Sequence, residues 1–165
     1  MASINGVEIK NVRYSKDHMG YTMAQGTVYL NGKKLGGWSQ DPWGGSGLYE
    51  FDKTLLTRAT DQYRYSGVID EGLEPLFNED DLLAIIVGLK DDETKYKKGI
   101  KKGYNAYIVC DNYTEAHAYY DNGTREEILN SSKFKDFVER HCLNAEDSVL
   151  PSRVSIYTDI KDFVI

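Results

Sequence analysis

Residues 26–38, with the sequence GTVYLNGKKLGGW, decide how the N-terminal part of this chain folds. Two runs of β-forming character, residues 26–30 and 33–38, flank the pair Asn31-Gly32. Both central positions of a type I′ turn require positive φ, which Asn and Gly adopt more readily than other residues. The stretch therefore predicts a tight antiparallel hairpin.

The segment before this hairpin also has the pattern of a strand. Val7 and Ile9 alternate with polar residues, and the alternation then shifts by one position to Val12 and Tyr14. A one-residue shift of this kind indicates a β-bulge. Asn5-Gly6 is expected to turn the chain into this strand, so the first fifty residues are predicted to hold three strands.

Two helices are predicted in the middle of the chain. Asp52 can cap the first, whose apolar face is formed by Leu55, Leu56, Ala59 and Tyr63. Asn78 is a good N-cap for the second, which acidic residues open and Gly103 ends. This helix could break at residues 88–92. Two charge pairs on it, Asp91–Lys95 and Glu93–Lys97, have the favourable i,i+4 spacing.

The last sixty residues predict a ββαβ arrangement. Residues 104–110 form a buried type of strand, with residues 115–120 as its expected partner. Thr124-x-x-Glu127 is a capping box for a helix that pauses at residues 130–132, and a final strand is expected at residues 154–157.

The order of elements predicts an α+β fold: one domain over residues 1–165, with a mainly antiparallel sheet, an N-terminal β-hairpin and three or four helices packed on it. Its parts are a β-rich part (1–50), a helical part (51–103) and the ββαβ part (104–165). Because strands and helices do not alternate regularly, a doubly wound parallel fold is not expected.

Composition narrows the classes of function. The chain has 165 residues and a formal net charge of −6, which argues against direct nucleic-acid binding. No apolar stretch approaches the roughly 20 residues that span a bilayer, and the N-terminus lacks the features of a signal peptide. We therefore expect a cytoplasmic protein with no membrane partner, in which Cys110 and Cys142 are reduced.

The strongest candidate for a binding segment is residues 36–47, which contain both tryptophans. Glycine allows close approach of a ligand, and tryptophan offers a large rigid contact face. The alternative is a loop whose indoles pack into the edge of the core. We expect Trp38, still on the strand, to be a buried anchor and Trp43 to be a contact residue. The predicted binding residues are Trp38, Asp41, Trp43, Gly44, Gly45 and Tyr49.

Other groups of residues are weaker candidates for a binding or catalytic site. The five lysines between residues 95 and 102 could hold phosphates, but cations at a helix C-terminus also stabilise the helix dipole. Cys110 with His117, or Asp41 with Glu50, could serve a small hydrolase. His141 and Cys142 are adjacent on a predicted helix, where neighbours point in different directions. We predict no catalytic residue, no metal site and no cofactor.

The N-terminal third resembles small proteins of bacteriophages and other mobile elements. The resemblance is carried by residues 7–12, by residues 29–36 and by the run WSQDPWGG at residues 38–45. It implies a counter-defence protein of the anti-CRISPR type, a non-enzymatic inhibitor that binds a host defence protein or nucleoprotein complex in the host cytosol. Sequestering a nucleotide signal is the alternative, a small hydrolase is the second alternative, and homo-oligomerisation stays open.

Overall fold

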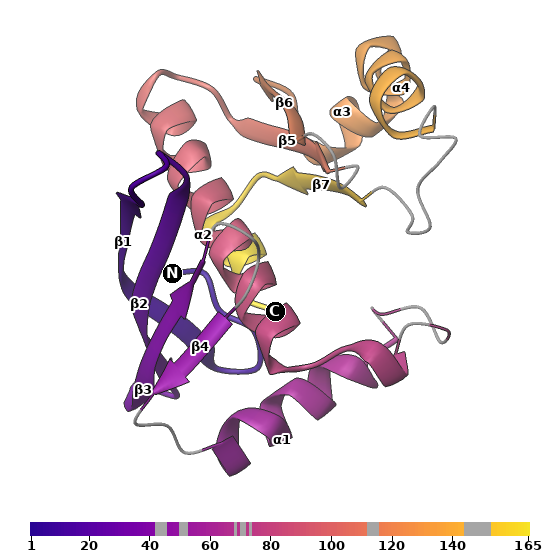
Figure 1. Cartoon of the computed structure of the whole chain (residues 1–165). Coiled ribbons are helices and arrows are strands. Elements are labelled where there is room, and N and C mark those ends of the chain that lie inside the picture. The colour runs from indigo at the N-terminus through magenta and orange to yellow at the C-terminus, as the bar shows by residue number, and fades with distance from the viewer. Residues whose placement is uncertain are drawn as a thin grey trace. The chain divides into compact units, whose positions relative to one another are not determined.

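The computed structural model of the chain describes residues 1–41, 46–49, 53–67, 69, 72, 74–111, 116–143 and 153–165. These residues form two antiparallel sheets and four α-helices, so the predicted α+β class is confirmed (Figure 1). Contacts divide the chain into two compact units, residues 1–91 with 164–165 and residues 92–163. The single domain over the whole chain stays a prediction.

The first unit is built on a four-stranded sheet. Its strands are β1 (Val7–Lys16), β2 (Thr22–Leu30), β3 (Lys33–Gln40) and β4 (Ser46–Tyr49), in that spatial order. The sequence did not predict β4, which is four residues long and contains a glycine, because its extended conformation is stabilised by pairing with β3.

The predicted turns of this sheet are all present. Asn31 and Gly32 have φ values of 49° and 80°, as a type I′ turn requires. Asn5 and Gly6 have φ values of 49° and 77°. The register of β1 against β2 shifts between Lys10 and Arg13, which confirms the bulge.

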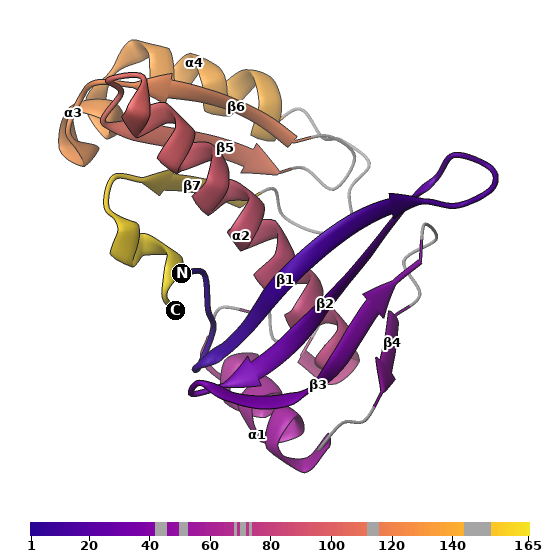
Figure 2. The same cartoon turned by 90° about the vertical axis from the view of Figure 1, so that its left-hand side faces the viewer.

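Helix α1 (Lys53–Arg64) and the first half of α2 (Glu79–Lys101) lie along one face of this sheet (Figure 2). The short 3₁₀ helix η1 (Glu74–Leu76) lies between them in the chain. Lys90 Nζ donates a 2.7 Å hydrogen bond to the carbonyl oxygen of Ile9 and so joins α2 to β1. The buried apolar side chains of these strands and helices include Val7, Ile9, Val28, Trp38, Leu56, Ala59, Tyr63, Leu82, Leu83 and Ile86.

Helix α2 runs without a break, so the interruption considered at residues 88–92 does not occur. One side of the helix stays buried across this stretch. Its buried residues recur at helical spacing: Ile86, Leu89, Glu93 and Tyr96. The helix begins as predicted, since Asn78 Oδ1 accepts hydrogen bonds from the backbone N–H groups of residues 80 and 81.

The two charge pairs predicted on α2 have different outcomes. Lys97 Nζ lies 2.6 Å from Glu93 Oε1, which confirms that pair. Lys95 pairs with Asp92 at 3.7 Å instead of with Asp91. Asp91 accepts a 3.0 Å hydrogen bond from the Tyr14 hydroxyl, so its carboxylate is already engaged.

The second unit contains the smaller sheet, with the strand order β6-β5-β7. Its strands are β5 (Ala106–Asp111), β6 (Ala116–Asp121) and β7 (Arg153–Tyr157), all antiparallel as predicted. Helices α3 (Arg125–Asn130) and α4 (Ser132–Val138) follow β6, with a π-helical turn η2 (Glu139–Leu143) after α4 and a 3₁₀ turn η3 (Ile160–Phe163) near the C-terminus. Ala106, Ile108, Ile128 and Ile156 form the core cluster.

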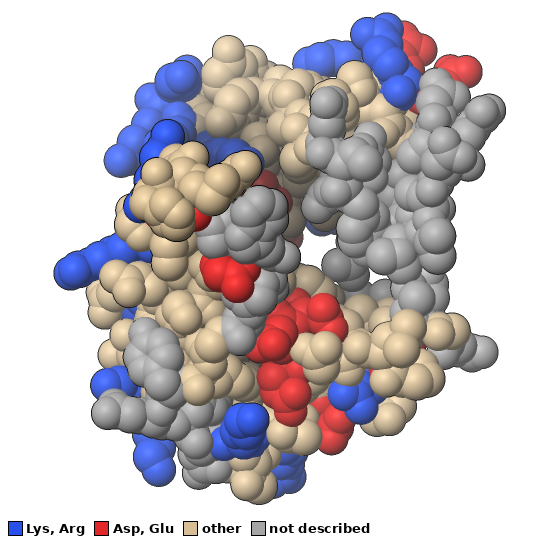
Figure 3. All heavy atoms as spheres, in the orientation of Figure 1, with Lys and Arg blue, Asp and Glu red and all other residues tan. Residues whose placement is uncertain are grey.

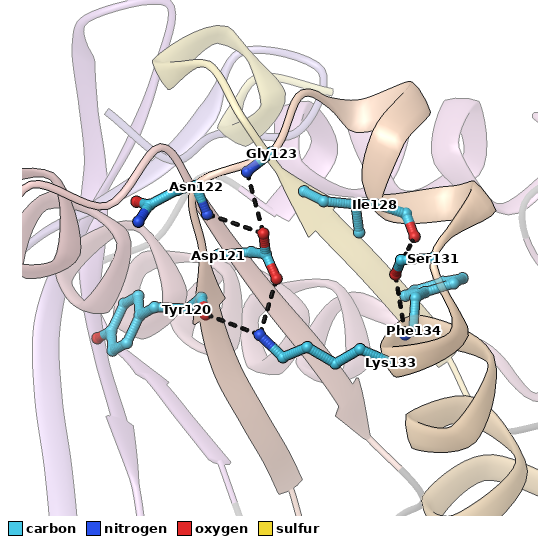
Figure 4. Close-up of polar contacts among 8 residues, drawn as sticks. All are labelled: Tyr120, Asp121, Asn122, Gly123, Ile128, Ser131, Lys133 and Phe134. Carbon is cyan, nitrogen blue, oxygen red and sulfur yellow. Dashed lines mark hydrogen bonds and ion pairs between the residues drawn. The ribbon is translucent and has the colours of Figure 1, made fainter.

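A polar network holds the turn between β6 and the helices (Figure 4). The Asp121 carboxylate accepts hydrogen bonds from the N–H groups of Asn122 at 2.8 Å and Gly123 at 3.0 Å, and from Lys133 Nζ at 2.8 Å. The bond from Lys133 is the main reason that the pKa of Asp121 lies below its ordinary value. Ser131, at the predicted pause, caps α4 by accepting from the Phe134 N–H at 3.1 Å.

Two glycines of α2 provide a matched test of packing. Alanine is favoured over glycine in a helix by roughly 1 kcal/mol. A Cβ at Gly88 would meet nothing within 4 Å, whereas a Cβ at Gly99 would lie 2.4 Å from a ring carbon of Tyr120. The Tyr120 ring cannot easily move, because its hydroxyl bonds the Lys95 carbonyl at 3.0 Å and the ring stacks on Tyr104.

We therefore expect Gly88→Ala to raise the free energy of unfolding by about 0.5–1 kcal/mol. Gly99→Ala should lower it by about 1–2 kcal/mol, since overpacking outweighs the gain in helix propensity. Urea denaturation followed by circular dichroism measures both. Equal effects of the two substitutions would contradict the close contact at Gly99.

Candidate functional site

The first predicted binding residue, Trp38, lies in the core of the first unit. Its side chain is 0% exposed, which confirms the expected buried anchor. Trp38 pairs across the sheet with Gly26 on one side and Leu48 on the other. A side chain with no exposed surface cannot touch a partner, so Trp38 is removed from the set of contact residues.

The remaining predicted residues are placed only in part. Asp41 is exposed directly after β3, and Tyr49 pairs with Gly37 in the β3–β4 ladder. Trp43, Gly44 and Gly45 lie outside the described residues, as does Glu50 of the suggested carboxylate pair. A contact role for the loop around Trp43 therefore stays a prediction.

A depression of about 250 Å³ in the first unit is lined by Leu48 of β4, Lys53 of α1, and Asn78, Glu79 and Asp80 at the start of α2. Acidic side chains gather here over the first turn of α2 (Figure 3). A hydrogen bond from Thr57 lowers the pKa of Glu79, and burial raises the pKa of Asp80. Because carboxylates at a helix N-terminus stabilise its dipole, these acids already have a structural role.

Two of the five lysines at the end of α2 have acidic partners on the same helix. Lys95 and Lys97 form ion pairs with Asp92 and Glu93 one turn earlier. For these two lysines the pairs favour the structural interpretation over a phosphate site, and nucleotide binding through the cluster stays a prediction.

The sequence did not predict an accessible apolar surface of the first unit that lies at the tip of the β1–β2 hairpin. We call residues 13–25 the arm. Among the described residues, β3 pairs with β2 as far as Ala24, and the part of the hairpin beyond it is formed by β1 and β2 (Figure 2). Four large apolar side chains are exposed on it: Tyr14 (53%), Met19 (63%), Tyr21 (43%) and Met23 (37%).

The turn of the arm is held by its own hydrogen bonds. The Asp17 carboxylate accepts from the N–H groups of Met19 at 2.8 Å and Tyr21 at 2.9 Å. The Asp17 N–H donates to the Tyr21 carbonyl at 2.9 Å, and Gly20 has a φ of 87°. The turn is therefore ordered without help from the core.

The arm also has a charge opposite to that of the whole chain. Arg13 and Lys16 are exposed on it, and its one carboxylate, Asp17, is engaged in the turn. Burial, with the hydrogen bond to Asp91, raises the pKa of Tyr14 to about 12, so this phenol stays neutral. Met19, Tyr21 and Met23 alternate with Gly20 and Thr22, the pattern of a half-buried strand, so nothing in the sequence indicated that these side chains are exposed.

The second unit brings together residues that the sequence analysis treated as separate candidates. Cys110 and Cys142 are joined in a disulfide, so the expectation of reduced thiols is wrong for this structure. The two cysteines are 32 residues apart, so no pattern among neighbouring residues indicated that they form a disulfide. The Cys110 sulfur is bonded, and a Cys110–His117 nucleophile is therefore not available in this state.

Two histidines lie at the same place. His117 is opposite Cys110 in the β5–β6 ladder, and its ring stacks on that of His141 with 4.0 Å between centroids. Burial and the neighbouring His117 lower the pKa of His141. In the disulfide-bonded state, no three His, Cys, Asp or Glu side chains within the described ranges are arranged to hold a metal ion.

No protein-family model matches the chain, and no curated protein or solved structure is significantly similar to it. Among the helices that the structure describes, none has both the length and the apolar character to cross a membrane.

Proposed function

We propose that this chain is a non-enzymatic binding protein whose main contact element is the arm, residues 13–25. The observation that carries this proposal is the group of three exposed apolar side chains at an ordered hairpin tip: Met19, Tyr21 and Met23. Tyr and Met are enriched in protein interfaces, where their large surfaces are buried on binding.

The order of the turn supports a binding role. A segment that is already in its bound conformation loses less conformational entropy when a partner binds. Asp17 supplies this order through two hydrogen bonds to the backbone of the tip. The apolar side chains are thus presented by a fixed scaffold.

The charges of the arm indicate the chemistry of the partner. Arg13 and Lys16 flank the apolar tip on a protein with a net charge of −6. A protein surface with an apolar recess and an acidic rim complements this arrangement, and such complementarity mainly accelerates association. Two lysine or arginine side chains are few for a nucleic-acid site, which usually needs a larger basic patch.

A phage-encoded inhibitor of a bacterial defence system, acting on a host defence protein or nucleoprotein complex, belongs to this class of protein. This narrower proposal rests on the resemblance of the N-terminal third. The expected result is that expression of the chain in a defence-proficient host raises the plating efficiency of a restricted phage. A chain carrying both Tyr21→Ser and Met23→Ser should fail to do so.

The arm itself is tested by photocrosslinking in the full chain. We expect a photoreactive phenylalanine derivative in place of Met19 to crosslink a host protein, and the same group in place of exposed Lys34, beside the Asn31-Gly32 turn, not to do so. Excess wild-type chain should compete, whereas the Tyr21→Ser/Met23→Ser chain should need at least about tenfold more. Identical crosslinks from both positions, or crosslinks only between copies of the chain, would contradict the proposal.

A further inference from the structure

Both cysteines and two of the three histidines of the chain meet at one place in the second unit. Cys110 comes from β5, His117 from β6, and His141 and Cys142 from η2. The Cα atoms of Cys110 and Cys142 are 6.3 Å apart, and the rings of His117 and His141 are 4.0 Å apart. Two cysteine and two histidine side chains from three separate elements thus lie in one cluster.

The backbone explains how four side chains converge. Residues directly opposite on antiparallel strands have Cβ atoms about 4.5–5.5 Å apart, so Cys110 and His117 lie on the same face of the sheet. His141 and Cys142 are neighbours in sequence, which would send them in different directions on an α-helix. In the π-helical turn η2, one contacts His117 and the other contacts Cys110.

Two thiolates and two imidazoles are a common ligand set for a structural zinc ion. Zinc binds them tetrahedrally, with Zn–S of about 2.3 Å and Zn–N of about 2.0–2.1 Å, which places neighbouring ligand atoms roughly 3.3–3.8 Å apart. Forming this geometry requires the sulfur–sulfur bond to open and the stacked rings of His117 and His141, whose planes are 29° apart, to turn so that one nitrogen of each faces the metal. Phe137 packs 5.1 Å from the His141 ring and provides an apolar wall beside the cluster.

We propose that Cys110, His117, His141 and Cys142 bind one Zn²⁺ when the disulfide is reduced. A thiol reductant supplies the two electrons: two RSH molecules become RSSR while the Cys110–Cys142 bond becomes two thiols. Each thiol then loses its proton to solvent as its sulfur binds the metal, and each neutral imidazole contributes a nitrogen lone pair. Disulfide and zinc ion are thus alternative links between η2 and the sheet.

Metal binding is tested on the full chain after reduction with a phosphine and removal of the excess reagent. Co²⁺ serves as a coloured substitute for Zn²⁺. We expect one Co²⁺ per chain, with the visible absorption of a tetrahedral site and a thiolate charge-transfer band, and displacement of both by Zn²⁺. The oxidised chain should show neither band. Absence of both bands from the reduced chain would overturn the proposal.

Substitutions identify the ligands. His117→Asn, His141→Asn and Cys142→Ser should each weaken Co²⁺ binding by more than about tenfold, since even changes beyond the direct ligands commonly cost 10–100-fold. His18→Asn is the matched control, because His18 is the third histidine of the chain and lies on the arm. An unchanged spectrum in both histidine variants, or an equal loss in His18→Asn, would overturn the assignment.

A measurement on the unsubstituted chain covers the case in which a variant fails to fold. Zn²⁺ should slow alkylation of the reduced cysteines by iodoacetamide, and a chelator should restore the rate. Equal alkylation rates with and without Zn²⁺ would also overturn the proposal.

Discussion

Trp38→Ala is expected to lower the free energy of unfolding by about 3–5 kcal/mol, the usual cost of removing a large buried aromatic side chain. The Trp38 side chain is 0% exposed and lies between neighbours on β2 and β4. The surrounding strands are tied into one ladder and can collapse only partly into the space left behind. Urea denaturation followed by far-UV circular dichroism measures the change.

Trp38→Phe is the matched control for this prediction. The indole Nε1 of Trp38 is buried without a hydrogen-bond partner among the described residues. A buried donor without a partner costs about 1–3 kcal/mol, so its removal offsets part of the lost volume. We expect Trp38→Phe to cost less than half as much as Trp38→Ala. A loss below about 1 kcal/mol for Trp38→Ala would contradict its place in the core.

Ile108→Ala is expected to cost about 2–5 kcal/mol, from lost burial and the remaining cavity. Ile108 lies on the central strand β5, is 0% exposed, and packs with Ile128 and Ile156. Leu129→Ala is the control, because Leu129 follows Ile128 in α3 but is 46% exposed. Its effect should stay within about 0.5 kcal/mol. Similar losses for Ile108→Ala and Leu129→Ala would contradict the core assignment.

Ile108→Ala also tests the predicted single domain. Helix α2 runs through the boundary between the two units, so we expect the units to unfold together. Hydrogen exchange should then show that Ile108→Ala lowers the protection of β2 amides as well as β5 amides. Loss of protection confined to residues 92–163 would mean two separate domains.

Short-range features of the fold could be predicted because each depends on neighbouring residues. Asn31-Gly32 specifies a turn through its φ angles, and Asn78 and Thr124 specify helix starts through their side-chain oxygens. These interactions form within four residues and hardly depend on the rest of the molecule. The continuity of α2 across residues 88–92 was less predictable, since it depends on which face is buried.

The candidate sites were predicted less well because they depend on distant contacts. The pattern of β1 and β2 predicts strands, but it does not show that the described part of β3 pairs only as far as Ala24 or that Met19 and Met23 are exposed. The sequence predicted Trp38 as the buried anchor from its place on the strand, and its complete burial follows from pairing on both sides of β3.

The sequence by itself determined the turns, the helix ends and the α+β class, because local φ preferences, capping and hydrophobic period act over a few residues. The tertiary structure alone decided that Tyr14, Met19, Tyr21 and Met23 stay exposed, and that Cys110 meets Cys142. Exposure and long-range pairing result from the packing of whole strands and helices, which brings together side chains more than thirty residues apart.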